Sequence, residues 1–519
     1  MFRITVNQKC KRQVYKLNTQ IKKVVVVGRD ADAWLSALML QLSFAKPEQS
    51  IEVHLVELPS KLHPHDTYSV LPSHKVLHKM LGISENMLFK AAAAQYALGQ
   101  RFVNWTDKSS YFHCYDTHGI NIGHVEFFQY WIKARQNGFE IPLEDFSLGV
   151  EVAKQGRFLA FSDDVQSFSK ATYGYHLNAL AYLQLIAKAA INAGLQHHIS
   201  QIKSVEIDEG VIKSLILETG SVVNGDLFID ASGPEARLIG ELEDTENFSS
   251  WQEWLPCDRK IILSAPTLSP APVFTQITAF KQGWIGFSPL PNRTAVTAIY
   301  SSRHASNNDV LQTMTAISRA KTEGAVESSF QSGARKKLWI GNCIAIGSAA
   351  VNLEPLDALQ LHALHLGLSL LRLFFPVNKS RMIEADTFNQ KMQSLIINFR
   401  DFQIAHYKLN RRFNEPFWDA LRNMAIPETL AAKIELFKHR GVIALLEDET
   451  FQEENWTSIF VGHGLIPHTF DPLVNKLSEE EHIEQFQNIL RYVVGEAQAM
   501  PSLSAHIEMT FESNKHSMF

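Results

Sequence analysis

The chain has few cysteines, no cysteine pair of the metal-binding kind and no excess of basic residues. Four cysteines in 519 residues do not make a disulfide framework, and without a C-x-x-C pair no zinc ribbon or other metal site is predicted. We therefore expect a reducing, cytoplasmic setting. Lys and Arg number 49 against 54 Asp and Glu, a net charge of −5, which argues against nucleic acid as a partner.

The chain also has no apolar run long enough for a transmembrane helix, which needs about 20 residues. The best run, residues 364–376, contains His365 and Arg372, and we interpret it as a buried helix. Residues 1–22 are mildly basic and lack the apolar core of a signal peptide, so they are interpreted as an extension before the first strand. No membrane association is predicted.

The elements that are present alternate between strand and helix patterns. Residues 24–27 are four valines, a continuous β-branched run that is typical of a buried parallel strand. Further elements are expected as follows: helices at 34–44 and 176–193, strands at 51–57, 215–230 and 260–300, a loop-rich aromatic stretch at 61–163, and mostly helices after Leu338.

This order predicts an α/β fold in three parts. Residues 1–22 form the extension, residues 23–375 a Rossmann-like domain with an antiparallel β insert, and residues 376–519 a mostly helical C-terminal lobe. A chain of this length is expected to fold into two or three lobes around a large core.

The turn after the first strand keeps only part of a dinucleotide-binding loop. Such a loop has the pattern G-x-G-x-x-G, but here only Gly28 remains, with Asp30 and Ala33 where the later glycines would lie. The strand, turn and helix still indicate a nucleotide-binding βα unit. Glu57, 29 residues after Gly28, ends the second strand, where an acid would accept hydrogen bonds from a ribose. An exposed acid at a strand end is the alternative.

Several later segments carry more specific patterns. Residues 227–233 run from a strand into Asp230 and small residues, and residues 339–347 run from a strand into Gly347. Two others are Arg400–Tyr407 with Pro416-Phe417-Trp418, and Trp456 followed by Gly462-x-Gly464. In this order, over about residues 22–505, the segments resemble the flavin-dependent tryptophan halogenases.

The resemblance implies an FAD-binding domain of the flavin monooxygenase type and a defined chemistry. In that family a separate reductase supplies reduced FAD, which reacts with oxygen to form a hydroperoxide that oxidises chloride. The hypochlorous acid crosses an internal tunnel to a lysine, and a glutamate assists its attack on an aromatic ring. FAD is therefore the implied cofactor and chloride the implied halide.

The cofactor positions can be carried over residue by residue. The resemblance places them at Gly28, Asp30, Ala31, Ala33, Glu57, Asp230, Gly347 and Leu356. Asp30 and Asp32 put carboxylates where a pyrophosphate would lie, and like charges there repel by up to several kcal/mol. The family pattern G-x-G-E-A-T-x-P corresponds to residues 65–72, where only the proline remains.

The catalytic positions depart from the family as well. Ala97 stands at the position of the lysine, and Asp357 at that of the glutamate. Lys90 lies in a similar local context but seven residues early, and a solvent-facing lysine is the better interpretation. The chloride-binding turn corresponds to residues 358–360, and the W-x-W-x-I-P motif to residues 284–289, of which Trp284 and the proline stand.

The positions that would contact the substrate match the family better. His113 and Tyr115 match positions that hold an indole in the family, with Trp284 and Trp456 nearby, and an aromatic cage binds a flat ring well. The alternative is that these side chains are simply core.

Two functions of different class follow. One is a binding protein on the halogenase fold, inactive as a halogenase, which takes a small aromatic ligand or pairs with a related halogenase in a homo- or hetero-oligomer. The other is an active FAD-dependent halogenase or monooxygenase that acts on an indole or another aromatic ring. Four altered motifs that serve cofactor, oxidant, chloride and catalysis favour the first.

Overall fold

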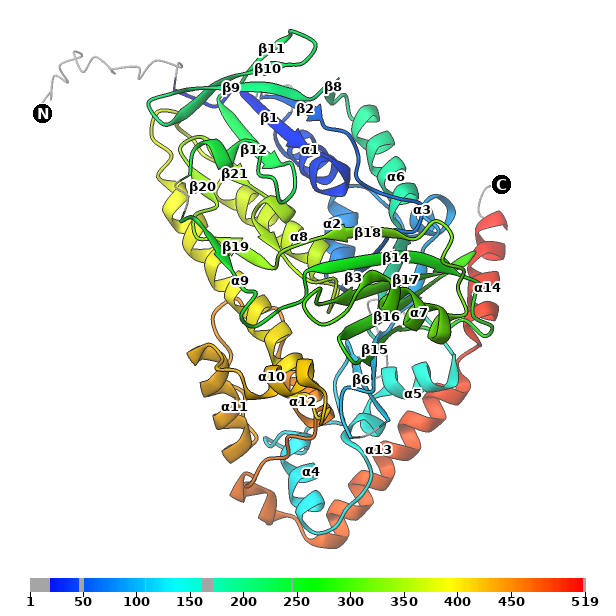
Figure 1. Ribbon diagram of the computed structural model, residues 1–519. Coiled ribbons are helices and arrows are strands. Elements are labelled where there is room, and N and C mark those ends of the chain that lie inside the picture. The colour runs from blue at the N-terminus through cyan, green and yellow to red at the C-terminus, as the bar shows by residue number, and fades with distance from the viewer. Residues whose placement is uncertain (1–18, 46–50, 108, 161–170, 244–245, 517–519) are drawn as a thin grey trace, which may run out of the picture.

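The computed structural model describes residues 19–45, 51–107, 109–160, 171–243 and 246–516, with side chains to residue 510 (Figure 1). The chain folds into a mixed α/β structure in which two large sheets are covered and joined by helices.

The first large sheet is built around the valine run. Its strand order is β20-β21-β12-β1-β2-β8, parallel except for the β20–β21 pair. All four valines of β1 are fully buried, because both faces of the central strand are covered. The strands are β1 (Lys23–Gly28), β2 (Glu52–Glu57), β8 (Gln196–Ile199), β12 (Leu227–Ala231), β20 (Trp339–Ile340) and β21 (Cys343–Ala345).

The second large sheet has the order β18-β14-β17-β16-β15-β5-β6 and is antiparallel apart from the β15–β5 pair. A separate hydrophobic cluster fills the space between this sheet and α7 (Asn307–Ser318). The strands are β5 (Gly99–Val103), β6 (Ser110–Cys114), β14 (Arg259–Ala265), β15 (Thr275–Phe280), β16 (Gly283–Leu290), β17 (Arg293–Tyr300) and β18 (Val326–Ser329).

Three small sheets complete the strands, with the orders β11-β10-β9, β13-β19-β22 and β3-β7-β4. The last of them joins segments about 80 to 110 residues apart, since β7 pairs with both β3 and β4. The strands are β3 (Thr67–Val70), β4 (Gln95–Ala97), β7 (Gly174–Asn178), β9 (Ile202–Asp208), β10 (Val211–Leu217), β11 (Val222–Asn224), β13 (Phe248–Ser250), β19 (Gly333–Arg335) and β22 (Val351–Asn352).

Helices surround the sheets and form the C-terminal part of the chain (Figure 1). The N-terminal helices are α1 (Asp30–Phe44), α2 (His74–Met80), α3 (Glu85–Ala91), α4 (Phe127–Gln136), α5 (Leu148–Gln155) and α6 (Ala179–Asn192). The C-terminal helices are α8 (Leu359–Leu373), α9 (Glu384–Lys408), α10 (Pro416–Asn423), α11 (Glu428–Arg440), α12 (Glu453–Gly462), α13 (Glu479–Ala499) and α14 (Leu503–His516).

The main hydrophobic core runs through the parallel sheet and the C-terminal helices alike, from Ile21 to Leu503. The boundary expected near residue 375 falls between α8 and α9, and both helices contribute to this one core. The two parts therefore share their packing.

The α/β class expected from the sequence is confirmed, and the strand expected at 339–347 is present as β20 and β21, but two local predictions were wrong. Residues 174–178 form a strand, although the expected helix began at 176, and the described residues between 61 and 160 hold short helices and strands instead of loops. Elements of three to seven residues carry little periodicity, and β3, β4 and β7 exist only through long-range pairing.

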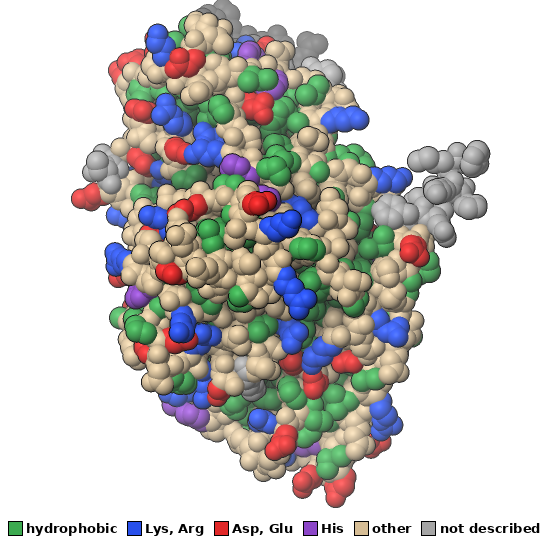
Figure 2. Space-filling model, turned by 45° about the vertical axis from the view of Figure 1, so that its right-hand side comes forward, with side chains coloured by type: hydrophobic (Ala, Val, Ile, Leu, Met, Phe, Trp, Pro, Cys, Tyr) green, Lys and Arg blue, Asp and Glu red, His purple; other side chains and the backbone are tan. Residues whose placement is uncertain are grey.

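The surface shows no single-sign field on the face in Figure 2, where acidic and basic side chains are interspersed. Within the described ranges, none of the helices combines the length and apolar character that a membrane span requires.

Candidate functional site

Gly28, the one glycine left in the dinucleotide loop, is required by strand packing. A Cβ at this position would lie 2.1 Å from the carbonyl oxygen of Ala231 on β12. The neighbouring strand therefore explains this glycine without any cofactor.

Asp30 begins α1 with a positive φ of 56°. Its carboxylate accepts hydrogen bonds from the Ser60 hydroxyl at 2.5 Å and the Lys61 amide at 3.2 Å. Beside it, Glu235 pairs with both Arg29 and Lys61. The cations that flank the loop are thus already matched by a carboxylate of the chain.

Asp32 connects the two loops that the sequence assigns to the cofactor. Its Oδ2 accepts the Ser348 amide at 2.9 Å and lies 2.4 Å from where a Gly347 Cβ would stand. Gly347 has a φ of +61°. Burial raises the pKa of Asp32 to about 6, partly offset by the hydrogen bonds from Ser348. The loop amide is therefore bound to an aspartate side chain.

The start of α1 has a further protein partner. The hydroxyl of Tyr68, on β3, lies within hydrogen-bonding reach of the Ala31 amide. Unpaired amides at a helix N-terminus are the groups that would bind a phosphate. Ala33 follows and is fully buried.

Glu57 ends β2 as expected, but both of its carboxylate oxygens have protein partners. Trp34 Nε1 donates to Oε1 at 3.0 Å, and His197 Nε2 lies 2.8 Å from Oε2. The acid that a ribose would need is held by the indole of α1 and an imidazole of β8.

Asp230 is fully buried and organises a turn of the chain. Its two oxygens accept hydrogen bonds from the amide and hydroxyl of Ser232 and from the amides of Leu238 and Ile239, at 2.6 to 3.0 Å. Four hydrogen bonds to one segment give this acid a structural role that the sequence pattern did not reveal.

Three family motifs that are far apart in sequence meet at one small cavity of about 60 Å³. They come from β3, β16 and the start of α8. The residues around the cavity are Thr67, Tyr68, Ser69, Gln100, Thr275, Ile277, Trp284, Gly286, Ser288, Thr297, Pro355, Ala358, Leu359 and Gln360.

Asp357 lies beside this cavity and is buried, with 2% of its surface exposed. Gln100, with its amide oriented to satisfy both groups, donates to Oδ1 and accepts the Asp357 amide, each at 3.0 Å. His406 Nε2 lies 3.3 Å from Oδ1, while Oδ2 has no partner among the described residues. Burial raises the pKa of Asp357 to about 7, against the effect of nearby His113.

Glu354 is a second buried acid that the sequence analysis did not single out. Its Oε2 accepts hydrogen bonds from the Tyr407 hydroxyl at 2.7 Å and from Trp284 Nε1 at 3.2 Å. Burial raises its pKa to about 7, and Asp357 adds to the shift. The sequence feature that could have pointed to Glu354 is the segment Glu354-Pro355-Leu356-Asp357, in which two acids lie three residues apart on either side of buried Leu356. Two such groups can hold or release protons near neutral pH.

Ala97 ends β4 opposite Gly174 and is buried, with 2% of its surface exposed. Lys90 lies in the last turn of α3 with its side chain exposed, as the sequence favoured. At the position that the resemblance assigns to the lysine, this chain therefore has a buried methyl group.

The four aromatic candidates do not form one cage. Trp284 faces Glu354 and the small cavity, whereas Trp456 packs in the core and donates to Glu449. His113 is buried beside Phe451 and Tyr115, with ring centroids 6.2 and 6.5 Å away. Only Tyr115 lines the larger pocket.

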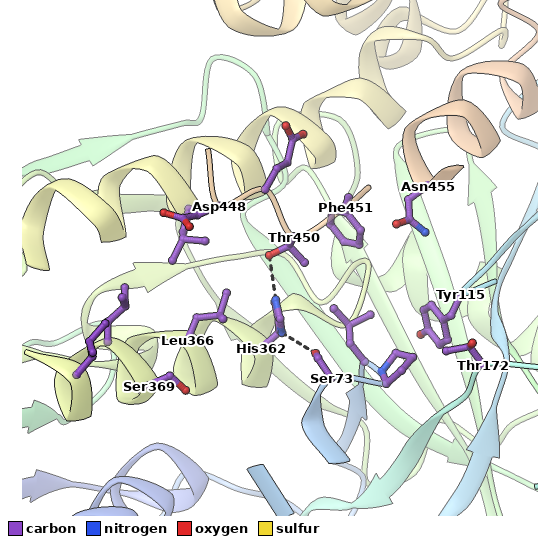
Figure 3. Close-up of a pocket in the computed structure, with 16 residues that line it drawn as sticks. Ser73, Tyr115, Thr172, His362, Leu366, Ser369, Asp448, Thr450, Phe451 and Asn455 are labelled. Carbon is purple, nitrogen blue, oxygen red and sulfur yellow. Dashed lines mark hydrogen bonds between the residues drawn. The ribbon is translucent and has the colours of Figure 1, made fainter. Parts of the chain in front are cut away.

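The larger pocket has a volume of about 550 Å³ and is drawn in Figure 3. One side is formed by leucines of α8 and α9, and the other by Tyr115, Thr172 and the segment 448–451. His362 lies in its wall, where Nδ1 meets the Ser73 hydroxyl at 3.1 Å and Nε2 meets Thr450 at 3.0 Å. The remaining lining residues are Leu71, Pro72, Leu366, Ser369, Leu370, Leu373, Leu395 and Asn455.

Comparison with known proteins gives one family. The sequence profile of the family described as tryptophan halogenase matches residues 23–479. Tryptophan 7-halogenase KtzQ of Kutzneria sp. is 26% identical, covering 87% of this chain and 90% of its own. Tryptophan 7-halogenase RebH of Lentzea aerocolonigenes is 24% identical, covering 88% and 92%.

The fold agrees with the sequence. The flavin-dependent halogenase BrvH from Brevundimonas sp. BAL3 superposes with a TM-score of 0.89 at 29% identity, covering 94% of this chain and 99% of its own. Xcc4156, a flavin-dependent halogenase from Xanthomonas campestris, gives 0.89 at 26% identity, covering 94% and 98%. The chain belongs to the tryptophan halogenase family.

Proposed function

We propose that this chain has lost FAD-dependent halogenation and acts as a binding protein for a small aromatic or apolar ligand. The ligand site is the 550 Å³ pocket beside Tyr115. The observation that carries the loss of chemistry is the hydrogen bond between Asp32 and the Ser348 amide, because it ties the two cofactor loops to each other.

The residues present do not fit an FAD pyrophosphate. Asp30 and Asp32 stand at the start of α1, and Glu235 neutralises the adjacent Arg29 and Lys61. A phosphate charge about 5 Å from one carboxylate is repelled by roughly 3 kcal/mol at an effective dielectric constant near 20. A binding site for a dianionic linker would need the opposite sign of charge.

The space at the flavin position supports the same conclusion. Ligand pockets are usually about 300–1,000 Å³, whereas the cavity between β3, β16 and α8 has about 60 Å³. Such a cavity takes a few water molecules or an ion and excludes a three-ring system.

The residues at the catalytic positions support the proposed loss of halogenation independently. Ala97 offers no hydrogen-bond donor to an oxidant, and the buried acid Asp357 is already engaged by Gln100 and His406. Catalysis in which an oxidant is positioned against a ring depends on such a donor.

The larger pocket supports retention of ligand binding. It is big enough for a small ring system, and its walls combine leucines with the rings of Tyr115 and Phe451. Asn455 and Thr450 can orient a ligand by hydrogen bonding, while His362 holds Ser73 and Thr450 in place.

The loss of cofactor is tested by titrating the purified protein with FAD and following flavin fluorescence, with an active family member as the positive control. We expect no saturation up to about 100 μM, which corresponds to binding weaker than about −5.5 kcal/mol. Micromolar affinity would contradict the proposal and would favour the alternative, an active halogenase or monooxygenase that needs a separate flavin reductase.

The ligand site is tested by saturation-transfer NMR with indole as the probe. We expect contact with indole in the wild type and its loss in Leu366→Trp, which fills the pocket. Ile317→Trp on the exposed face of α7 is the matched control. Indole contact that survives Leu366→Trp would place the ligand elsewhere.

A further inference from the structure

Four buried histidines lie together where α2 packs against α8, directly behind the wall of the larger pocket. We call them the histidine cluster, and none is more than 7% exposed. Two lie one turn apart on α2 and two one turn apart on α8: His74, His78, His362 and His365.

The four rings form a continuous chain. The centroids of His74 and His78 are 4.7 Å apart, those of His74 and His365 5.8 Å, and those of His362 and His365 6.3 Å. The Tyr182 hydroxyl of α6 lies 2.7 Å from His78 Nε2 and 3.4 Å from His74 Nε2. This row of rings ends at the larger pocket, where His362 contacts the hydroxyls of Ser73 and Thr450.

The groups that face the cluster are neutral. They are Tyr182 from α6, Ser73 at the start of α2 and Thr450 from the pocket segment, with the Phe399 ring of α9 against His362. Within the described ranges no carboxylate forms an ion pair with any of the four, and Nδ1 of both His78 and His365 has no partner.

A metal ion does not account for the arrangement. In the described part of the chain, no three His, Cys, Asp or Glu side chains are grouped as a metal site requires. The histidines are instead packed as neutral rings. Burial and mutual repulsion lower the pKa of His74 and bring that of His78 and His362 to about 3, and burial brings the pKa of His365 to about 4.

The helix that carries two of these rings is poorly anchored otherwise. α2 has seven residues, and its buried side chains are His74, Leu77 and His78. The outer face is open to solvent, with Val76 59% exposed. Two of the three buried side chains of α2 are histidines, which bind a proton more easily in water than in their buried positions. The contacts that hold α2 therefore weaken in acid.

We propose that the histidine cluster makes the α2–α8 contact acid-sensitive: protons taken from solvent drive α2 away from α8, open the pocket wall at Ser73 and His362, and release the ligand. The release of ligand rests on the function proposed above, whereas the separation of α2 does not.

The sign and size follow from linkage. A histidine with a lowered pKa in the closed state is neutral there, and it returns to a pKa of about 6.5 when solvated. The closed state therefore has its full stability above pH 6.5 and loses stability as pH falls below 6.5. At pH 5.5 each solvated histidine favours opening about tenfold, so His74 and His78 together give about 100-fold.

The test is amide hydrogen exchange of the full chain at pH 7.5 and 5.5, corrected for the intrinsic rate of chemical exchange. We expect protection of residues 77–83 to fall about 100-fold or more while that of the buried strand β1 is kept. Protection of α2 that stays within about threefold, or that falls only in step with β1, would overturn the proposal.

Variants separate titration from mere loosening. His78→Gln removes one titrating group, so the pH effect on α2 is expected to shrink about tenfold. His439→Gln, at an imidazole 63% exposed, is the matched control and should leave the effect unchanged. An unchanged pH effect in a folded His78→Gln would contradict the proposal, and the wild-type profile decides if that variant does not fold. FAD titration at pH 7.5 tests the proposed function separately.

Discussion

The cofactor side and the ligand side of the molecule differ in how their polar groups are used. Around the Gly28 loop, Asp30, Asp32 and Glu57 are all bound by the chain itself, next to a cavity of about 60 Å³. The larger pocket, lined by Tyr115, Phe451 and leucines of α8, has a volume of about 550 Å³.

The difference shows that two regions of one fold can use their polar groups in different ways. Glycines in a binding loop leave backbone amides free, whereas side chains at the same positions satisfy those amides and fill the space. On the ligand side the walls are leucines and aromatic rings, which pack against each other without closing the pocket. Function on this fold therefore has to be argued from each site separately.

The largest effect is expected for the ion pair in the wall of the larger pocket. Lys433 and Glu449 are 4% and 1% exposed and lie 3.0 Å apart. Lys433→Met should lower the free energy of unfolding by about 3–5 kcal/mol, because Glu449 is left buried without its cation. Urea unfolding measures this, and adding Glu449→Gln should restore part of the loss. A cost below about 1 kcal/mol would show that the wall is not held by this pair.

The next effect concerns Asp357, the buried acid beside the small cavity. A carboxyl whose pKa rises to about 7 on folding favours the fold in its protonated form and opposes it as pH rises from about 4 to 7. Asp357→Asn should therefore stabilise the protein at pH 8 by about 2–4 kcal/mol, and by about 1 kcal/mol less at pH 6.

Urea unfolding of both proteins at the two pH values checks this, and the contribution of the histidines cancels in the difference. Glu218→Gln at an exposed turn is the control and should change little. A destabilised Asp357→Asn at pH 8 would mean that the carboxylate is charged and needed where it lies.

The difference in cost between two leucine substitutions distinguishes pocket from core on α8. Leu364 is fully buried, whereas Leu366 lines the larger pocket. Leu364→Ala should cost about 2–5 kcal/mol, while Leu366→Ala should cost about 1 kcal/mol because that side chain already borders open space. Equal costs by thermal or urea unfolding would mean that the pocket is closed in solution.

The smallest effect is expected from restoring the family's lysine. Ala97→Lys, supplied with FAD, a flavin reductase, oxygen and chloride, should give no chlorinated indole by mass spectrometry, because the closed cofactor side remains. Product from this single change would show that only the lysine had been lost.

Much of the fold was predictable from local pattern. The valine run, the helix after it and the acid at Glu57 indicated the βα unit, and strands at 260–300 were confirmed as β14–β17. The short elements at 61–163 were not predictable, since strands such as β3 and β4 depend on pairing with a segment 80 to 110 residues away.

The site was predictable only in part. Motif order indicated the family to which residues 65–72, 284–289 and 358–360 correspond, and the structure brings residues from all three segments to one cavity. The partners of other site residues were not predictable. Asp230 accepts hydrogen bonds within a turn, Trp456 donates a hydrogen bond to Glu449, and Glu354 is buried near Asp357. These contacts lie only two to nine residues apart along the chain, but they depend on turn and helix geometry that the residue pattern did not reveal.

The sequence by itself determined the family, the α/β class and the presence of a single glycine in the loop after β1, because those follow from residue identity at ordered positions. Only the tertiary structure decided that Asp32 binds the Ser348 amide, that the flavin-side cavity is small and that four histidines share one interface. The physical reason is that a hydrogen bond, a cavity or a ring contact depends on distances between segments, which spacing along the chain does not fix.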